Sequence, residues 1–529
     1  MADSYETLMA EMGDKIVMGD WHISRDGGVW LSEPQVRKGE VVGYTTKVAS
    51  PIPILPLSLL HNADSFTERV EIGIYKNHRW KRIITNRATI ANKSTIVKLA
   101  DEGVEVNTGN SAVLVRYLGD VIPQSLETLP RKTGKSVMGW IGDDFMPYSN
   151  TATFDGDDSY GYLYRAITQA GTLEEWCEYI RPLRQKLEVR LCMAAAFASP
   201  LIERVAENPF VFHLWGGTGV AKTVTLMIAM SIWGNPALGK LTRTMNMTTN
   251  SMLSTAAFLN NLPFAGDELQ TIKDRWGNFD KLVMCVTEGL DRGRMTYDKV
   301  NDTKAWKCSF LFSGEEPCIK PESGGGAKNR VIEIECHEKL VEHGNDTASF
   351  VREHYGTAGP KFIEAVKMYN VASLYRAVFN EIIDTCDTTD KQAGAMALML
   401  VADRMASALF WADEKPLGVG DVAPFMASAK EVDVAERAYQ FVCDLVVENA
   451  NNFMSDAKTT WGRVENDAVY FITNVLDREL ADAGFDFAAV RNKWLERGYM
   501  VRYKNNVVRW MVRLNGMVSS CVKIQMRKE

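Results

Sequence analysis

Apolar and polar positions near the start of this chain alternate as they do in β-strands. Alternation along residues 68–75 and again along 80–85, with a polar turn between them, predicts a β-hairpin. The segments 89–103 and 112–118 have the spacing and stop signals of helices. These elements predict a small α/β domain, which we place at residues 1–150.

The middle of the chain has a different pattern, in which short continuous apolar runs alternate with helical spacing. Such runs are typical of buried strands, and they begin at residues 211, 262, 307 and 331. Helical spacing covers residues 172–204 before them and 391–412 after them. We therefore expect three segments here, namely a helical connector at 151–205, an α/β core at 206–345 and a helical lid at 346–455.

The last part of the chain predicts two helices and a hairpin. In order, these elements are a strand from residue 469, helices over 476–483 and 487–497, and hairpin arms over 499–504 and 507–514. The hairpin is expected to turn at Asn505 and Asn506. Two helices followed by a hairpin describe a winged helix, which we place at residues 456–529.

The composition is that of a globular protein with several domains. Hydrophobic residues make up 46% and charged residues 24% of the 529 positions, and domains of about 150 residues would give three or four of them. The nine cysteines form no C-x-x-C pair, so neither a zinc ribbon nor a disulfide framework is indicated. No apolar stretch reaches the ~18 residues of a membrane span, and the first residues are acidic. We expect a cytoplasmic protein that binds no membrane.

Charge is distributed unevenly along the chain. The net charge is −7, yet residues 491–529 hold ten Lys or Arg against two Glu. This asymmetry indicates a partner, for which DNA is the expected candidate. The candidate contacts are Arg491, Lys493, Arg497, Arg502 and Lys504, with Arg509 and Arg513 beside them. The alternatives are a solvated basic tail and a domain that only packs on an oligomer.

The N-terminal hairpin carries a second group of basic residues. Four cations accompany two aromatic residues there, namely Lys76, Arg79, Lys81 and Arg82 with Tyr75 and Trp80. Such a surface can bind a nucleic-acid backbone and stack bases, and a solvated hairpin face is an equal alternative.

The first central strand leads into the most informative motif. Residues 211–223 read VFHLWGGTGVAKT, which is a strand, a glycine-rich turn and a Lys-Thr pair that opens a helix. Small residues let backbone N–H groups point at phosphates, a lysine reaches the same oxygens, and a hydroxyl ligates Mg²⁺. The predicted ATP and Mg²⁺ ligands are Gly216, Gly217, Thr218, Gly219, Val220, Ala221, Lys222 and Thr223. Ala221 stands where this motif has glycine, so the backbone there must accommodate a Cβ.

Acidic and polar residues follow the next two strands. Asp267 and Glu268 end the second strand, and this pair is what a phosphate-hydrolysing site requires. The aspartate would hold Mg²⁺, and the glutamate would polarise the attacking water. Ser313 and Glu315 end the third strand, where sensor residues would face the γ-phosphate.

Two further basic features belong to the same region. Residues 291–306 predict a hairpin with polar, basic tips, and Arg330 opens the fourth strand. An arginine held at a strand start can complete a neighbouring subunit's ATP site by neutralising transition-state charge. The alternative for Arg330 is a solvated flank.

In this set of motifs the chain resembles the AAA+ helicase-like ATPases of prophages and mobile genetic elements, a family catalogued as a domain of unknown function. The resemblance spans roughly residues 20–415. It is carried by 83–118, by Met138-Gly-Trp140, by the glycine-rich loop with its flanking 212–215 and 232–236, by 262–268 and by Ser313-Gly-Glu315. Relatives on chromosomal cassettes and pathogenicity islands act as replication helicases similar to MCM proteins.

The resemblance implies an AAA+ P-loop core of the α/β class, with a small α/β domain before it and a helical lid and winged helix after it. By this likeness Lys299, with Arg292, Arg294 and Lys304, would contact DNA in a central pore. Arg330 would be an arginine finger, and Arg404 is a candidate second sensor.

The expected function is that of an ATP-hydrolysing DNA helicase or translocase that forms a hexameric ring and replicates a phage or mobile element. Single-stranded DNA would occupy the pore and duplex DNA the winged helix, and a separate primase or initiator would be a partner. One alternative is an ATP-switched DNA-binding initiator or helicase loader. Another is a nucleotide-controlled scaffold or defence sensor that does not unwind DNA.

Overall fold

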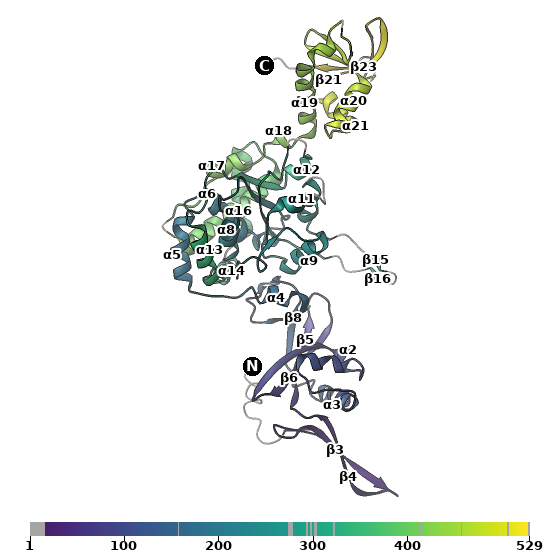
Figure 1. Cartoon of the computed structure of the whole chain (residues 1–529), viewed down its shortest axis with the longest axis vertical. Helices are drawn as coiled ribbons and strands as arrows, with labels where there is room; N and C mark the ends of the chain where they lie inside the picture. The colour runs from purple at the N-terminus through teal and green to yellow at the C-terminus, as the bar shows by residue number, and fades with distance from the viewer. Residues whose placement is uncertain are drawn as a thin grey trace. The chain divides into compact units, whose positions relative to one another are not determined.

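The chain forms two compact units, Met1–Tyr164 and Arg165–Glu529, each with its own core. Figure 1 shows the computed structural model from which this division follows. The structure describes residues 16–156, 158–272, 279–291, 295–296, 299–300, 304–320, 323–412, 414–455, 457–504 and 507–526. The finer division into five segments stays a prediction.

The first unit contains an antiparallel sheet that the sequence pattern did not predict. Its order is β1-β2-β3-β4, and its strands are β1 Ile16–Met18, β2 Trp21–Ser24, β3 Gly28–Arg37 and β4 Glu40–Ser50. The distal parts of β3 and β4 extend from this unit as a two-stranded ribbon (Figure 1).

A second, mixed sheet in this unit has the order β11-β8-β5-β6-β7. Its strands are β5 Ile54–Asn62, β6 Glu68–Lys76, β7 Arg79–Asn86, β8 Arg131–Lys135 and β11 Ala152–Phe154, and a separate pair consists of β9 Gly139–Ile141 and β10 Asp144–Met146. β6 and β7 are antiparallel, with Tyr75 opposite Trp80. The predicted N-terminal hairpin is therefore confirmed.

The helices of the first unit differ from prediction in one place. They are α2 Arg87–Ile90, the 3-10 segments η1 Ile96–Glu102 and η2 Asp158–Tyr160, α3 Ser111–Gln124 and α4 Gly161–Tyr164. The single helix predicted over 89–103 is wrong. The Asn92 side chain accepts a hydrogen bond from Ser94 N at 2.9 Å, and this local turn interrupts the helix. Gly103, at φ 99°, ends η1 as predicted.

A parallel five-stranded sheet lies in the second unit, in the order β13-β14-β17-β12-β18. Its strands are β12 Val211–Trp215, β13 Thr242–Thr244, β14 Phe264–Asp267, β17 Phe310–Gly314 and β18 Val331–Glu335. The four predicted apolar runs all form strands of this sheet. Val211 pairs with Phe310 on one side and with Val331 on the other, so neighbouring strands start and end at the same levels.

Helices surround this sheet and continue beyond it. Those before and beside the sheet are α5 Leu173–Leu183, α6 Leu187–Ala198, α7 Leu201–Arg204, α8 Lys222–Met230, α9 Thr249–Leu259, η3 Leu269–Ile272, α11 Asp280–Thr287 and α12 Gly325–Lys328. Those after it are α13 Gly344–Glu353, α14 Ala358–Met368, α15 Val371–Thr385, α16 Asp390–Phe410, α17 Val419–Val422, η4 Ala423–Phe425 and α18 Ala429–Val432. The short strands β15 Met295–Thr296 and β16 Lys299–Val300 pair as an antiparallel hairpin between α11 and β17.

The helix α16 is long and apolar enough to cross a membrane by length and composition, but 78% of its apolar window is buried inside the protein. Its Asp403, which is fully buried, forms ion pairs with Arg184 at 3.1 Å and with Arg190 at 2.7 Å. A buried charge network of this kind fixes the helix against α5 and α6, so α16 is a core helix of the second unit.

The C-terminal region combines helices with a small sheet. Its elements are α19 Val434–Glu448, η5 Ala450–Phe453, β19 Gly462–Glu465, β20 Ala468–Ile472, α20 Thr473–Asp482, α21 Phe487–Glu496, β21 Met500–Val501, β22 Arg509–Leu514 and β23 Met517–Gln525. The predicted ladder between 499–504 and 507–514 is replaced by another pairing, because both β21 and β22 pair with β23. The two predicted arms still bond where they meet, since Tyr503 N donates to the carbonyl of Val507 at 2.7 Å. The hairpin turns at Asn515 and Gly516, at φ 44° and 82°, and Asn-Gly is the stronger turn signal. Asn505 and Asn506 lie outside the described residues.

Candidate nucleotide-binding site

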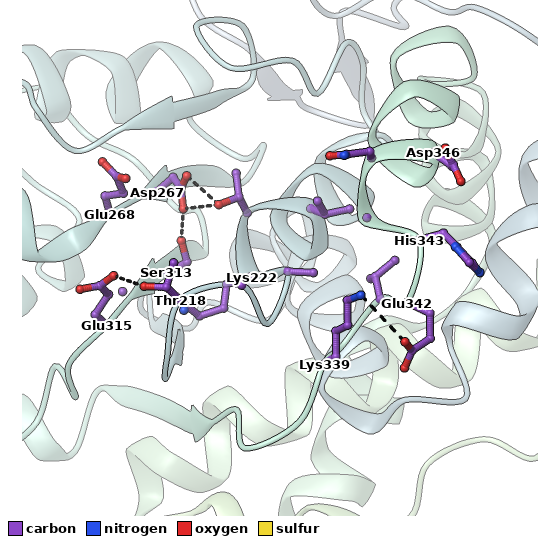
Figure 2. Close-up of a pocket in the computed structure, with 18 of the residues that line it drawn as sticks. Thr218, Lys222, Asp267, Glu268, Ser313, Glu315, Lys339, Glu342, His343 and Asp346 are labelled. Atoms are coloured by element: carbon purple, nitrogen blue, oxygen red, sulfur yellow. Dashed lines mark hydrogen bonds and ion pairs between the residues drawn. The ribbon is translucent and has the colours of Figure 1, made fainter.

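The carboxyl ends of β12, β14 and β17 meet at one edge of the parallel sheet and open into a cavity of about 610 Å³. In open parallel sheets, ligands bind outside the carboxyl ends of the strands. Figure 2 shows the residues that line the cavity, with Asp267, Glu268 and Glu315 on one side of Lys222 and with Lys339, His343 and Asp346 on the other.

The glycine-rich turn connects β12 to α8, which begins at Lys222. A Cβ at Gly216 would lie 2.6 Å from the carbonyl oxygen of Cys336, so no other residue fits there without movement of the backbone. Lys222 folds back over the turn, and its Nζ donates hydrogen bonds of 2.8 Å to the carbonyls of Gly216 and Gly217. The turn therefore holds a cation against its own backbone at the N-terminal end of a helix.

Ala221 has the conformation that the motif assigns to glycine. Its φ and ψ are 69° and 30°, in the left-handed region, directly before the first residue of α8. Left-handed backbone costs an L-residue with a Cβ roughly 1–2 kcal/mol. The turn keeps its shape and carries this strain in the backbone of Ala221.

Asp267 is the centre of a hydrogen-bond group that joins three elements. Thr223, on α8, donates to its two carboxylate oxygens at 3.1 and 2.9 Å. Ser313, at the end of β17, donates to the same carboxylate. Asp267 is 7% exposed and Ser313 1% exposed. A hydroxyl and a carboxylate at this distance are oxygen ligands of the kind that Mg²⁺ prefers.

Glu268 and Glu315 differ in their surroundings. Glu268 is exposed and has φ 61°, so a non-glycine residue in the left-handed region follows Asp267. Glu315 accepts a hydrogen bond of 2.8 Å from Thr218 of the turn. Gln270, which the sequence did not single out, accepts a hydrogen bond from Glu315 N at 3.4 Å. The left-handed backbone of Glu268 is strained, and backbone strain of this kind is typical of functional sites.

The opposite wall of the cavity was missed by sequence reasoning. It comes from the segment 339–346, which runs from the loop after β18 into the first turn of α13. Leu340 N donates to the carbonyl of Val220 at 3.0 Å, which ties this segment to the glycine-rich turn. Cys336 lies just before it, and burial raises the pKa of its thiol to about 12. The segment carries no periodic or motif signal, so only the fold brings it to the site.

Arg330 lies at the other end of the sheet from the cavity. Val211 N donates to the carbonyl of Arg330 at 3.0 Å, so Arg330 is level with Phe210. Six strand positions, or about 20 Å, separate that level from Gly216. The guanidinium donates to the carbonyl of Gly326 at 2.7 Å and contacts Met284 Sδ at 3.1 Å. Within one chain, Arg330 and Lys222 therefore do not share a site.

The residues predicted to contact DNA in a pore are only partly described. Arg292 and Arg294 lie outside the described residues, and for Lys299 the structure describes the backbone in β16 only. Lys304 follows the hairpin, and its Nζ donates to Ser254 of α9 at 2.9 Å. Arg404, on α16, pairs with Glu381 at 3.7 Å and does not line the cavity.

The basic residues of the C-terminal region fall into two classes. Arg491 and Lys493 are exposed on α21, and Arg502 and Lys504 are exposed after β21. Arg497 instead lies near two carboxylates of the α19 start, at 2.5 Å from Asp433 and 3.5 Å from Glu436. Its hydrogen bond to Asp433 raises the pKa of the Arg497 guanidinium. The charge of Arg497 is thus already neutralised within the protein, whereas Arg491 and Lys493 form no ion pair with another described residue.

Comparison with solved structures finds the same fold in a protein described as "SCCmec type IV Cch - active helicase". The TM-score is 0.73 at 17% identity, over 97% of this chain and 98% of that chain. At this identity the likeness shows a shared mixed α/β fold with a parallel sheet. A structure of the "NrS-1 C terminal region" aligns over 87% of this chain and 94% of that chain, with 9% identity and a TM-score of 0.33, which is too low to support an argument.

Comparison with protein families gives two matches. Residues 433–529 match the "Cch helix turn helix domain". A search of curated protein sequences found no match. Residues 22–305, more than half of the chain, match the family described as "Domain of unknown function (DUF927)". The chain belongs to the DUF927 family.

Proposed function

We propose that this protein is an ATP-dependent DNA helicase or translocase with an AAA+ core, which works as a hexameric ring in the replication of a phage or mobile genetic element. The observation that carries the proposal is the group formed by Lys222, Thr223, Asp267 and Ser313 at the carboxyl ends of three parallel strands. An ammonium, two hydroxyls and a carboxylate line one cavity there, beside the glycine-rich turn. These groups are the ones that bind a nucleoside triphosphate and Mg²⁺ in phosphate-binding loops.

Each residue has a role that follows from its position. Lys222, which now bonds the carbonyls of Gly216 and Gly217, would turn to the phosphate oxygens, and Thr223 and Asp267 would hold Mg²⁺. The metal, when bound, neutralises charge that develops on the phosphates. Glu268, which is exposed beside Asp267, orients the attacking water, and Ser313 fixes the Asp267 carboxylate.

The strand order supports the AAA+ assignment. β17 lies between β12, which carries the glycine-rich turn, and β14, which carries Asp267. A strand inserted between these two is the arrangement expected of an AAA+ core. It places Ser313 and Glu315 between the phosphate-binding turn and the acidic strand, where a sensor contacts both.

The position of Arg330 supports a ring. It cannot reach the cavity of its own subunit, because about 20 Å of strand lies between them. Lys391 is close to Arg330. The pKa of Lys391 is lowered, first by burial and then by the charge of Arg330. Two neighbouring cations suit an anion, and the γ-phosphate in an adjacent subunit's cavity is that anion.

Two observations support DNA as the polymer along which the protein translocates. The backbone of β15 and β16 forms a hairpin between β14 and β17 in the chain, where the resemblance to MCM proteins places a pore hairpin. The fold is also shared with a protein described as an active helicase. Lys299 would contact the strand in the pore, and α21 would contact duplex DNA through Arg491 and Lys493.

Unwinding of a forked duplex tests this proposal. Wild-type protein with ATP and Mg²⁺ should separate the strands, Lys222→Ala should lose both hydrolysis and unwinding, and Lys299→Ala should keep hydrolysis and lose unwinding. Lys361→Ala, at an exposed position on α14, is the matched control. DNA-stimulated hydrolysis without unwinding, under conditions where rings form, would contradict the helicase function and favour an ATP-switched initiator or loader.

A further inference from the structure

The small C-terminal sheet has two faces, and the described helices α20 and α21 pack against one of them. Phe471 on β20 pairs with Val522 on β23, and both belong to the core that includes residues of α20 and α21. Successive strand residues point to opposite faces. Tyr470 and its partner Lys523 therefore lie on the face that points away from these helices.

Three aromatic rings gather on this second face. The Trp510 ring lies 4.8 Å from the ring of Tyr503 and 5.6 Å from the ring of Tyr470, both in edge-to-face geometry. Trp510 Nε1 donates to the carbonyl of Val501 at 3.1 Å, which fixes the indole. Tyr503 is 48% exposed, although its ring packs against Trp510. The rings form a fixed surface that remains open to solvent at Tyr503.

Cations surround the same rings. The Lys523 ammonium lies 5.4 Å from the ring centres of both Tyr470 and Trp510, and Lys504 lies 5.5 Å from the centre of Tyr503. In the described part of the chain, neither lysine pairs with a carboxylate. Arg463 lies 5.8 Å from the Tyr470 ring and also pairs with Glu465 at 2.9 Å. In the described part of the chain, two ammonium groups without a carboxylate partner thus lie beside aromatic rings that pack edge to face.

The chain that contributes most of this aromatic face has basic residues and lacks acidic ones. Residues 499–526 contain five Lys or Arg and no Asp or Glu. A purely structural aromatic cluster needs neither unpaired lysines nor a half-exposed tyrosine. A polyanion that also has flat apolar surfaces satisfies both features, since bases stack on aromatic rings and phosphates attract the ammonium groups.

We propose that this aromatic face, formed by Tyr470, Tyr503 and Trp510 with Lys504 and Lys523, binds single-stranded DNA by base stacking. It lies on the side of the sheet opposite α20 and α21, so it is separate from the duplex contact proposed for Arg491 and Lys493. It requires no nucleotide hydrolysis. The C-terminal region would then contact duplex DNA with its helices and a separated strand with its sheet.

Binding measured by fluorescence anisotropy tests the proposal on the full-length protein without nucleotide. The probes are labelled oligo(dT) and a labelled blunt duplex. Tyr503→Ala should weaken oligo(dT) binding by about tenfold and leave duplex binding unchanged, because each stacked base contributes roughly 1–3 kcal/mol. Tyr503→Phe should keep the wild-type affinity, since it retains the ring. Tyr369→Ala, another exposed tyrosine of the second unit, is the matched control.

The helix variant completes the comparison. Arg491→Ala combined with Lys493→Ala should weaken duplex binding and spare oligo(dT). Equal losses for both probes with Tyr503→Ala, or no loss for oligo(dT), would overturn the proposal. Photocrosslinking of thiothymidine-containing oligo(dT) provides a second measurement that does not depend on other DNA-binding sites. Adducts on the peptide that contains Tyr503 and Trp510 are expected, and adducts found only elsewhere would overturn it. Unwinding activity is not part of either measurement, so failure of the helicase proposal would leave this result interpretable.

Discussion

The nucleotide cavity and the surface of the C-terminal region use charged residues in different ways. In the cavity, the Asp267 carboxylate accepts hydrogen bonds from both Thr223 and Ser313. These two partners lie at the start of α8 and the end of β17. On the C-terminal surface, Arg491 and Lys493 are exposed on one helix. The effects of substitutions within one hydrogen-bond network are coupled, so changing one residue impairs the others. Exposed cations instead make small, separate and salt-dependent contributions to DNA affinity. The two regions therefore call for different tests.

The largest effect is expected at Arg330. Arg330→Ala should lower ATP hydrolysis by about 1000-fold, as loss of an arginine finger does. When this variant is mixed with Lys222→Ala, hydrolysis should reappear, because some interfaces combine an intact turn from one subunit with an intact Arg330 from the next. Steady-state hydrolysis across mixing ratios measures this recovery.

Arg376→Ala, at an exposed position on α15, is the control for the Arg330 variant and should hydrolyse ATP normally. A mixture no more active than its components would show that Arg330 does not act between subunits.

A smaller but still large loss is expected at Asp267. Asp267→Asn keeps the shape of the side chain and removes the charge that two hydroxyls and Mg²⁺ share, so hydrolysis should fall by about 100-fold. Metal titration should show that half-maximal hydrolysis needs a higher Mg²⁺ concentration, because the site has lost an anionic ligand. Asp384→Asn, an exposed carboxylate on α15, is the matched control. Wild-type hydrolysis by Asp267→Asn would remove Asp267 from the metal site.

On the C-terminal surface, salt dependence separates free from neutralised cations. Arg491→Ala should weaken duplex binding several-fold and reduce the slope of log K against log salt by about one unit. Arg497→Ala should leave that slope nearly unchanged, because Asp433 and Glu436 already balance its charge. Anisotropy titrations at a series of salt concentrations give both slopes. An equal reduction of the slope by both variants would contradict this division.

The smallest effect is expected at Ala221. Glycine removes the cost of the left-handed backbone but also gains freedom in the unfolded chain, so Ala221→Gly should stabilise the protein by less than about 1 kcal/mol. Ala229→Gly, inside the helix α8 that follows Ala221, should instead destabilise the protein by about 1 kcal/mol or more. Denaturant unfolding measures both changes. Destabilisation by Ala221→Gly would show that the alanine side chain is needed in the turn.

Sequence reasoning succeeded where a feature is local. The glycine-rich turn, the Asp267-Glu268 pair and the end of β17 are contiguous motifs behind apolar runs, so both the strands and their polar ends could be predicted. The structure places Lys222, Asp267 and Ser313 around one cavity. Their chemical roles stay predictions.

It failed where tertiary context or competing turn signals decide the outcome. The segment 339–346 reaches the cavity only because β18 lies beside β12, and nothing in its own sequence marks it. In the C-terminal region, the sequence did not reveal that residues 509–514 pair with the strand after them, across the turn at Asn515 and Gly516. The left-handed backbone of Ala221 was not predicted either, since alanine itself gives no sign of it.

The separation of Arg330 from its own cavity has a consequence for how the protein behaves in solution. If each active site is built from two chains, the specific activity of the enzyme depends on its concentration. Dilution alone would then silence hydrolysis without any inhibitor. A protein of this kind would consume little ATP while its subunits are dispersed, and it would begin to do so only where they are gathered, for example along DNA.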